Sequence, residues 1–191
     1  MLNELKTFGI NEGYFEIKRI REFPNAAKQG ISHINTLAID FDKTTEILCG
    51  EHGQESFKSC DALDIVELKN RINLIEFKQL IDQPDIEKWI EDIELPQKIK
   101  ESHVVLLNII KKSKFIHKDK RRKFTDCEKN VIISFSLSGV ASKRLAIVIR
   151  YSVIEEIILK QFRENYPQGE NYNSPVCIRM AKFDTDYSKY V

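Results

Sequence analysis

Two carboxylates and a lysine stand on neighbouring apolar runs of the chain. The first run reads S-C-D-A-L-D-I-V-E-L-K and contains Asp61, and the second reads I-N-L-I-E-F-K-Q-L and contains Glu76 and Lys78. Charged side chains in apolar surroundings are costly unless they pair with one another or with a metal ion. Mg²⁺ prefers oxygen ligands, usually one or two carboxylates together with water and a substrate phosphate. Asp61 and Glu76 are therefore candidate ligands for Mg²⁺, or for Mn²⁺ in its place, and Lys78 would lie beside the reacting water or the phosphate.

The two runs predict an antiparallel β-hairpin. They are rich in Val, Ile, Leu and Phe and flank the polar break at 69–71, a pattern that favours a hairpin over a helix. Successive side chains on a strand alternate faces, so a two-residue turn would place Ile65 opposite Glu76 and keep Asp61 on the face of Glu76. A three-residue turn would slip the pairing by one residue and bring Asp64 to that face instead.

The pattern of Asp61 and Glu76-Phe77-Lys78 resembles the PD-(D/E)xK nuclease superfamily, which has the restriction-endonuclease-like fold. In that family an Asp near the start of one hairpin strand and a Glu-x-Lys near the end of the next form a metal-dependent site. The resemblance covers the hairpin and, more loosely, the segment that follows it to about Lys112, and its spacing favours Asp61 over Asp64. Cys60 occupies the place of the family's nominal Pro. The resemblance implies that Asp61, Glu76 and Lys78 are catalytic and that Asp61 and Glu76 hold the metal.

The function implied by the resemblance is Mg²⁺-dependent hydrolysis of phosphodiester bonds in nucleic acid, with DNA favoured over RNA. Family habit adds three expectations: an effector role in a restriction or antiviral defence system, a protein partner that supplies activation or ATPase function, and a homodimer for cutting both strands. The chain contains no Walker phosphate loop of its own. The alternative is a non-catalytic binding, inhibitor or immunity protein that keeps the nuclease fold.

Further side chains are candidates for the same site. In the family a helix before the hairpin contributes another Glu, for which Glu46, Glu51 and Glu55 stay open. The helix after the Glu-x-Lys strand sometimes offers a polar side chain, although solvation on the helix surface is the favoured explanation for each such residue here. Those residues are Gln97, Lys98 and Ser102.

A basic run lies between Lys111 and Lys123. It reads K-K-S-K-F-I-H-K-D-K-R-R-K, with Asp119 its one acidic residue, although the net charge of the whole chain is only +1. Such a run could neutralise several phosphates, and each contact would add affinity that falls with salt. A solvated loop explains the pattern equally well. The candidate nucleic-acid-binding residues are Lys111, Lys112, Lys114, Lys118, Lys120, Arg121, Arg122 and Lys123.

The remaining pattern predicts an α/β fold with a mixed central β-sheet flanked by helices, a restriction-endonuclease-like core. Alternation of apolar residues predicts strands outside the hairpin at 13–20, 37–41, 130–137, 144–151 and 176–183. Helical spacing predicts helices at 85–93, from Leu95 onward and at 152–163. One continuous helix from Ser142 is the alternative to the strand and helix predicted between 144 and 163.

Composition is that of an ordinary globular protein. A chain of 191 residues with 42% hydrophobic and 31% charged residues predicts a single nuclease-like domain over 1–191, with its core at approximately 37–165. No apolar run approaches the roughly 20 residues of a membrane span. The N-terminal residues lack the order of a signal peptide, and the four cysteines form no Cys-x-x-Cys pair. We therefore expect a cytoplasmic protein with free thiols and no membrane association.

Overall fold

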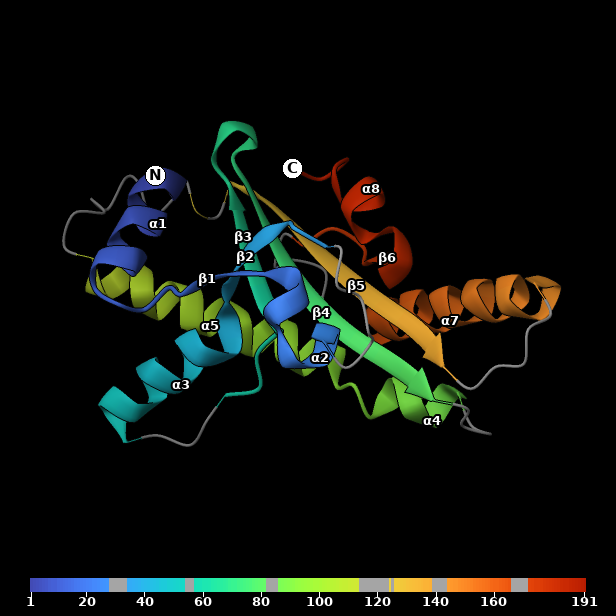
Figure 1. Cartoon of the computed structure of the whole chain (residues 1–191). Helices are drawn as coiled ribbons and strands as arrows, with labels where there is room; N and C mark the ends of the chain where they lie inside the picture. The colour runs from blue at the N-terminus through green and yellow to red at the C-terminus, as the bar shows by residue number, and fades with distance from the viewer. Residues whose placement is uncertain are drawn as a thin grey trace.

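A computed structural model of the chain contains six strands in one sheet, ordered β1-β2-β3-β4-β5-β6 (Figure 1). The structure describes residues 1–27, 34–53, 57–81, 86–113, 124, 126–138, 144–165 and 172–191. The strands are β1 Ile17–Arg19, β2 Leu37–Asp40, β3 Ala62–Val66, β4 Arg71–Ile81, β5 Glu128–Ser138 and β6 Val176–Arg179. The helices are α1 Leu2–Asn11, α2 Pro24–Ala27, α3 Phe41–His52, α4 Ile86–Glu91, α5 Leu95–Lys112, α7 Arg144–Asn165 and α8 Phe183–Tyr187.

The sheet is mixed: β4 is antiparallel to its neighbour β3 and parallel to its other neighbour β5. Neighbouring strands from β1 to β4 are antiparallel, whereas β4, β5 and β6 run parallel. The connection from β4 to β5 contains α4 and α5, because parallel neighbours need a crossover of a dozen or more residues. The predicted α/β class with a mixed, helix-flanked sheet is therefore confirmed.

Helices cover both faces of the sheet (Figure 1). Leu63 and Leu74 point into the core that α1, α5 and α7 help to fill, whereas Ala62 and Ile75 point into a second core that includes residues of α2 and α8. Alternate residues of one strand thus belong to different cores, as the period of two requires. We call the first face the α5 face and the second the α8 face.

The β3–β4 turn corrects the predicted register without changing the face of Asp61. Ile65 pairs with Ile72 and not with Glu76, because a 3₁₀ turn over Glu67–Lys69 and then Asn70 separate the two strands. Asn70 has φ of 49°, a left-handed conformation that asparagine adopts more readily than most residues. The slip relative to the prediction is four residues. An even slip leaves each side chain on its original face, so Asp61 and Glu76 remain together.

Three other segments differ from the prediction. Residues 144–151 belong to the single helix α7, so the continuous helix was the correct alternative. The strand expected at 37–41 ends at Asp40 and Phe41 begins α3, because the Asp40 side chain accepts a hydrogen bond from the Lys43 amide and caps the helix. The strand expected at 13–20 shortens to β1, and the one at 176–183 shortens to β6 because 3₁₀ turns follow both.

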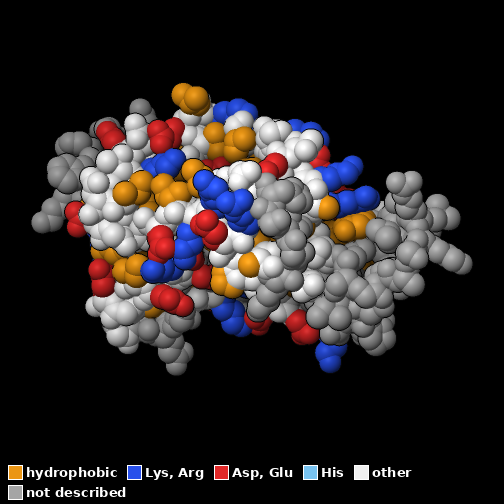
Figure 2. All heavy atoms as spheres, viewed as in Figure 1, with side chains coloured by type: hydrophobic (Ala, Val, Ile, Leu, Met, Phe, Trp, Pro, Cys, Tyr) orange, Lys and Arg blue, Asp and Glu red, His pale blue; other side chains and the backbone are white. Residues whose placement is uncertain are grey.

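Helix α5, strand β5 and a helix at the position of α4 were predicted correctly. Figure 2 shows acidic and basic side chains interspersed on the viewed face. In the part of the chain that the structure describes, no helix combines the length and hydropathy of a membrane span.

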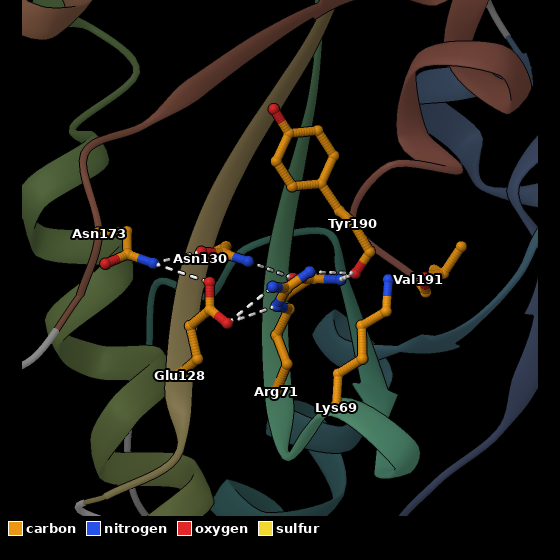
Figure 3. Close-up of polar contacts among 8 residues, drawn as sticks. Lys69, Arg71, Glu128, Asn130, Asn173, Tyr190 and Val191 are labelled. Atoms are coloured by element: carbon orange, nitrogen blue, oxygen red, sulfur yellow. Dashed lines mark hydrogen bonds and ion pairs between the residues drawn. The ribbon is translucent and has the colours of Figure 1, made fainter.

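A buried polar network fastens the C-terminal residues to β4 and β5 (Figure 3). Asn130 Nδ2 donates to Asn73 Oδ1 at 3.0 Å across the two strands, and Asn130 Oδ1 accepts from Asn173 Nδ2 at 2.7 Å. Asn73 Nδ2 donates to the Tyr187 hydroxyl at 3.1 Å. Arg71 donates both to Glu128 and to the carbonyl of Tyr190. These contacts hold α8 against the sheet at the end of β4 that is remote from Glu76.

We expect Asn130→Ala to destabilise the fold by about 1–3 kcal/mol, because it removes the hydrogen bond that the buried Asn73 Oδ1 accepts from Asn130. Urea denaturation measures the change. Asn165→Ala is the matched control, since Asn165 is exposed at the end of α7 and its loss should cost less than about 0.5 kcal/mol. Equal effects of the two variants would show that the network contributes nothing to stability.

Candidate functional site

Asp61 directly precedes β3, at the point where β4 continues beyond β3 and keeps only β5 as a neighbouring strand. Its Oδ2 accepts a hydrogen bond from the backbone amide of Phe77 at 2.6 Å, and its Oδ1 accepts from Asn25 Nδ2 at 2.8 Å. The carboxylate therefore replaces the ladder partner that β4 lacks at this point. Asn25 belongs to α2, so Asp61 is held from the α8 face as well as from the sheet. Asp61 is 4% exposed.

Glu76 lies directly across from Asp61. Ala62 pairs with Ile75, and one further step along the antiparallel register brings Asp61 opposite Glu76. Glu76 is 0% exposed and points to the α5 face. The two carboxylates thus lie close enough for the charge of Asp61 to act on Glu76.

Two ammonium groups share one oxygen of Glu76. Lys78 Nζ and Lys98 Nζ each lie 2.7 Å from Glu76 Oε1. Lys78 comes from the same strand and Lys98 from the first turn of α5. Glu76 Oε2 is buried and has no hydrogen-bond partner among the described residues. One oxygen of the carboxylate therefore has two ammonium partners, whereas the other has no hydrogen-bond partner among the described residues.

The charges of this cluster perturb one another. Burial and, to a lesser extent, the charge of Asp61 raise the pKa of Glu76 to about 7, against the opposing effect of Lys98 and Lys78. Burial alone would lower the pKa of Lys98, but the charge and hydrogen bond of Glu76 outweigh it and raise that pKa. Burial also raises the pKa of the adjacent Cys60 thiol, with the charge of Glu76 adding to the effect. Glu76 thus titrates near neutral pH while Lys98 stays charged.

Ser102 and Cys60 join α5 to the start of β3. The Cys60 amide donates to Ser102 Oγ at 3.0 Å, and both residues are fully buried. Lys98 and Ser102 are one helical turn apart and lie on the same side of α5. Solvation on the helix surface is therefore the wrong explanation for these two residues. Gln97 fits that explanation, since it donates to Glu101 on the exposed side of the helix.

A cavity of about 400 Å³ opens beside Asp61, between α2 and α3. Its lining includes the acidic residues Asp40, Asp42, Glu46 and Asp61, with Lys43 among them. Asp42 accepts a hydrogen bond from Ser59 Oγ at 2.7 Å. Desolvation by neighbouring atoms raises the pKa of Asp42 to about 6, with a smaller contribution from the charge of Asp61. An acidic cavity of this kind favours cations.

Of the two upstream glutamates that the structure describes, Glu46 is the one beside the cluster. It lines the cavity with Asp61, whereas Glu51 pairs with Lys112 and Tyr14 at the other end of α3. Glu55 lies outside the described residues. The structure therefore brings one of the three candidates to the site.

Asp64, the alternative to Asp61, points to the opposite face. Its carboxylate accepts a hydrogen bond from the Tyr187 hydroxyl at 2.6 Å, on the α8 face. Burial raises the pKa of Asp64 against the effect of that bond. Asp64 is thus separated from Glu76 by the sheet itself.

The structure describes only the first residues of the basic run, up to residue 113. Lys114, Lys118, Lys120, Arg121, Arg122 and Lys123 lie outside the described residues. Lys111 and Lys112 form the last turn of α5, and Lys112 is paired with Glu51.

Comparison of the chain with known protein families, curated proteins and solved structures finds no match.

The donor set fits a hard divalent cation. Asp61 and Glu76 offer carboxylate oxygens, the type that Mg²⁺ and Mn²⁺ prefer, and Glu76 Oε2 is buried without a partner among the described residues. The described residues contain no group of three His, Cys, Asp or Glu side chains arranged to hold a metal. A cation here would therefore take two carboxylates and complete its shell with water or a ligand phosphate, the usual pattern for Mg²⁺.

Lys98, Ser102 and Asn25 complete the site beyond the predicted trio. Ser102 interrupts the apolar stripe of α5 that includes Ile99 and Leu106, and a polar residue in such a stripe is a detectable signal. Lys98 lies at the border of that stripe. Asn25 has no comparable signal, because only the tertiary fold brings α2 to the start of β3.

The raised pKa of Glu76 predicts a pH dependence of stability. A carboxyl whose pKa is higher in the folded than in the unfolded protein favours folding when protonated, so its contribution is complete below about pH 4.5 and is lost as pH rises to about 7. The free energy of unfolding should fall by about 3 kcal/mol across that range, at 1.4 kcal/mol per pKa unit. Urea denaturation of the wild type and of Glu76→Gln between pH 4 and 8 measures it.

Glu76→Gln should remove this dependence. Asp42→Asn is the control. Asp42 is more exposed than Glu76 and its pKa, about 6, is lower, so this variant should change the free energy of unfolding less, and only below about pH 6. A Glu76→Gln profile parallel to that of the wild type would contradict the assignment.

Proposed function

We propose that the chain is a metal-dependent nuclease of the PD-(D/E)xK type that hydrolyses phosphodiester bonds of nucleic acid, with DNA as the favoured substrate. The observation that carries the proposal is the proximity of Asp61, just before β3, to Glu76 on β4, where Lys78 Nζ lies 2.7 Å from Glu76 Oε1. The acidic cavity beside Asp61 supports it, because it offers an open approach to one of the two carboxylates.

A structural role alone explains this cluster poorly. Burying two carboxylates and two ammonium groups costs desolvation energy that ion pairing repays only with good geometry and full hydrogen bonding. Glu76 Oε2 lacks that completion among the described residues. Apolar side chains of similar volume would stabilise the same hairpin at least as well, so the charges are better explained by a function.

Each side chain then has a role. A bound Mg²⁺ would polarise the scissile phosphate and lower the pKa of a coordinated water. Asp61 and Glu76 hold the cation, and Lys78, whose side chain is 24% exposed, positions the water and offsets negative charge on the phosphate in the transition state. Lys98, 17% exposed and fixed in α5, keeps the Glu76 carboxylate in place.

Substrate and partners extend the proposal beyond the site. The basic run from Lys111 to Lys123 supplies nucleic-acid contacts through phosphate charge, which carries no base information. An effector role in restriction or antiviral defence, an activating partner and a homodimer for double-strand cleavage belong to the same proposal.

We expect Asp61→Asn, Glu76→Gln and Lys78→Ala to reduce Mg²⁺-dependent or Mn²⁺-dependent cleavage of DNA by about a hundredfold or more, because each removes charge from the reacting centre. Asp64→Asn is the matched control, since Asp64 stands three residues from Asp61 on the other face of the sheet. Its cleavage rate should stay within a few-fold of the wild type. Cleavage of a supercoiled plasmid and of short duplex and single-stranded oligonucleotides gives the readout.

Wild-type cleavage by both Glu76→Gln and Lys78→Ala would exclude the proposed chemistry. A wild type that binds nucleic acid but never cleaves it would favour the non-catalytic binding protein. Loss of activity in Asp64→Asn beside an active Asp61→Asn would reverse the assignment of the two aspartates.

Cation affinity should depend on pH through Glu76. Because a carboxyl must lose its proton to bind a metal ion, Mn²⁺ affinity should rise with pH up to about 7 and level off above it. Calorimetric titration of the wild type and of Glu76→Gln at pH 5.5, 6.5 and 7.5 tests this. The variant should bind weakly at each pH, and an identical affinity profile for both proteins would remove Glu76 from the metal site.

A further inference from the structure

Lys78 belongs to a row of side chains that crosses three parallel strands. Lys78 on β4 pairs with Phe135 on β5, and Phe135 pairs with Arg179 on β6. Residues in register on adjacent strands of a sheet point to the same face, so all three side chains lie on the α5 face. The neighbouring row is Glu76, Ile133 and Cys177. Arg179 is therefore the counterpart of Lys78 at the outer strand of the sheet.

Arg179 is held in place by an aromatic ring. Its guanidinium carbon lies 4.2 Å from the centroid of the Tyr151 ring, and Tyr151 in turn lies 5.0 Å from the ring of Phe135. A guanidinium stacked on an aromatic face keeps its N–H groups available at the edge of the plane, where they can donate to an oxyanion. Arg179 forms no ion pair with an acidic side chain among the described residues and is partly exposed. The stack therefore orients a charge that has no ion-pair partner among the residues that the structure describes.

The row itself carries two basic side chains, Lys78 and Arg179. Beside Lys78 and Arg179, the described part of α7 contributes Glu155, whose charge adds to burial in raising the pKa of Cys177 in the neighbouring row. The acidic cavity lies on the other side of Asp61, toward α2 and α3.

We infer that Arg179, oriented by Tyr151, binds a backbone phosphate of the nucleic acid at a position flanking the one beside Lys78. The inference rests on the proposed function, because it takes Lys78 as the residue nearest the scissile phosphate. Strands in a sheet are spaced by about 4.8 Å, so the backbones of Lys78 and Arg179 are about 10 Å apart. Since duplex DNA rises about 3.4 Å per base pair, that separation corresponds to a few nucleotides. Parallel β4, β5 and β6 all end at this edge, the place where open α/β sheets usually bind ligands.

Binding of a fluorescein-labelled DNA duplex and of its single strand, without divalent cations, over a series of NaCl concentrations tests the inference. Arg179→Gln keeps a planar head that can lie over Tyr151 but removes the charge. It should weaken binding about tenfold at low salt and reduce the slope of log affinity against log salt by about one, as expected for one phosphate contact. Arg163→Ala, which removes an exposed arginine from the distal end of α7, is the matched control and should bind as the wild type does.

A second pair of variants separates binding from packing. Tyr151→Phe keeps the ring and should keep affinity, whereas Tyr151→Leu removes the stack and should weaken binding in the same direction as Arg179→Gln. Thermal unfolding is measured for each variant. If Arg179 only packs α7 against β6, Arg179→Gln will lower the melting temperature and leave the affinity and salt slope of the folded protein unchanged, which overturns the inference.

Cleavage kinetics distinguish this failure from failure of the proposed function. If the wild type cleaves DNA, Arg179→Gln should raise KM with little change in kcat; an unchanged KM would overturn the inference and leave the nuclease proposal standing. If the wild type binds without cleaving and Arg179→Gln still flattens the salt slope, the phosphate contact stands and the nuclease proposal fails.

Discussion

The buried carboxylate of Glu76 is the interaction on which the site depends. It has no contact with solvent and carries two ammonium groups on one oxygen, so its charge survives in the fold only through Lys78 and Lys98. Because Lys98 belongs to α5, the same ion pair fixes where that helix lies over β4. Asp61 then sets the charge balance from the opposite strand and raises the pKa of Glu76. Hairpin, crossover helix and site are therefore one electrostatic unit.

The Asp61–Glu76 cluster has an acidic cavity on one side and the parallel strands β5 and β6 on the other. Strand β3 begins at Ala62, whereas antiparallel β4 continues past that point to Ile81, so the Asp61 carboxylate can accept the Phe77 amide of β4 together with Asn25 of α2. One side opens to the acidic cavity, and the other leads across β5 and β6 to Arg179. A site at such a junction can present a cation to one part of an anionic polymer and basic side chains to the next.

The hairpin, α5 and β5 could be predicted from the sequence, because apolar residues recur in each at a long, regular spacing. The predicted turn was wrong, but the register differs from the prediction by four residues. An even shift leaves every strand side chain on the face that was predicted for it. The strand predicted at 144–151 was wrong. Ile147, Val148 and Ile149 have high β-propensity, but in the fold they belong to helix α7. Asp40 was a recognisable N-cap that the polar residues after it obscured. Asn25 could not have been predicted, since its contact with Asp61 joins segments 36 residues apart.

The hydrogen bond from the Phe77 amide to Asp61 makes one backbone proton a reporter of the site. An amide that donates to a charged carboxylate resonates differently from one that donates to a neutral or metal-bound carboxylate, and this bond is 2.6 Å long. The ¹H–¹⁵N resonance of Phe77 should therefore respond to cations and to protonation without any label at the site itself. The secondary structure that shapes the cluster thus also provides its own spectroscopic probe.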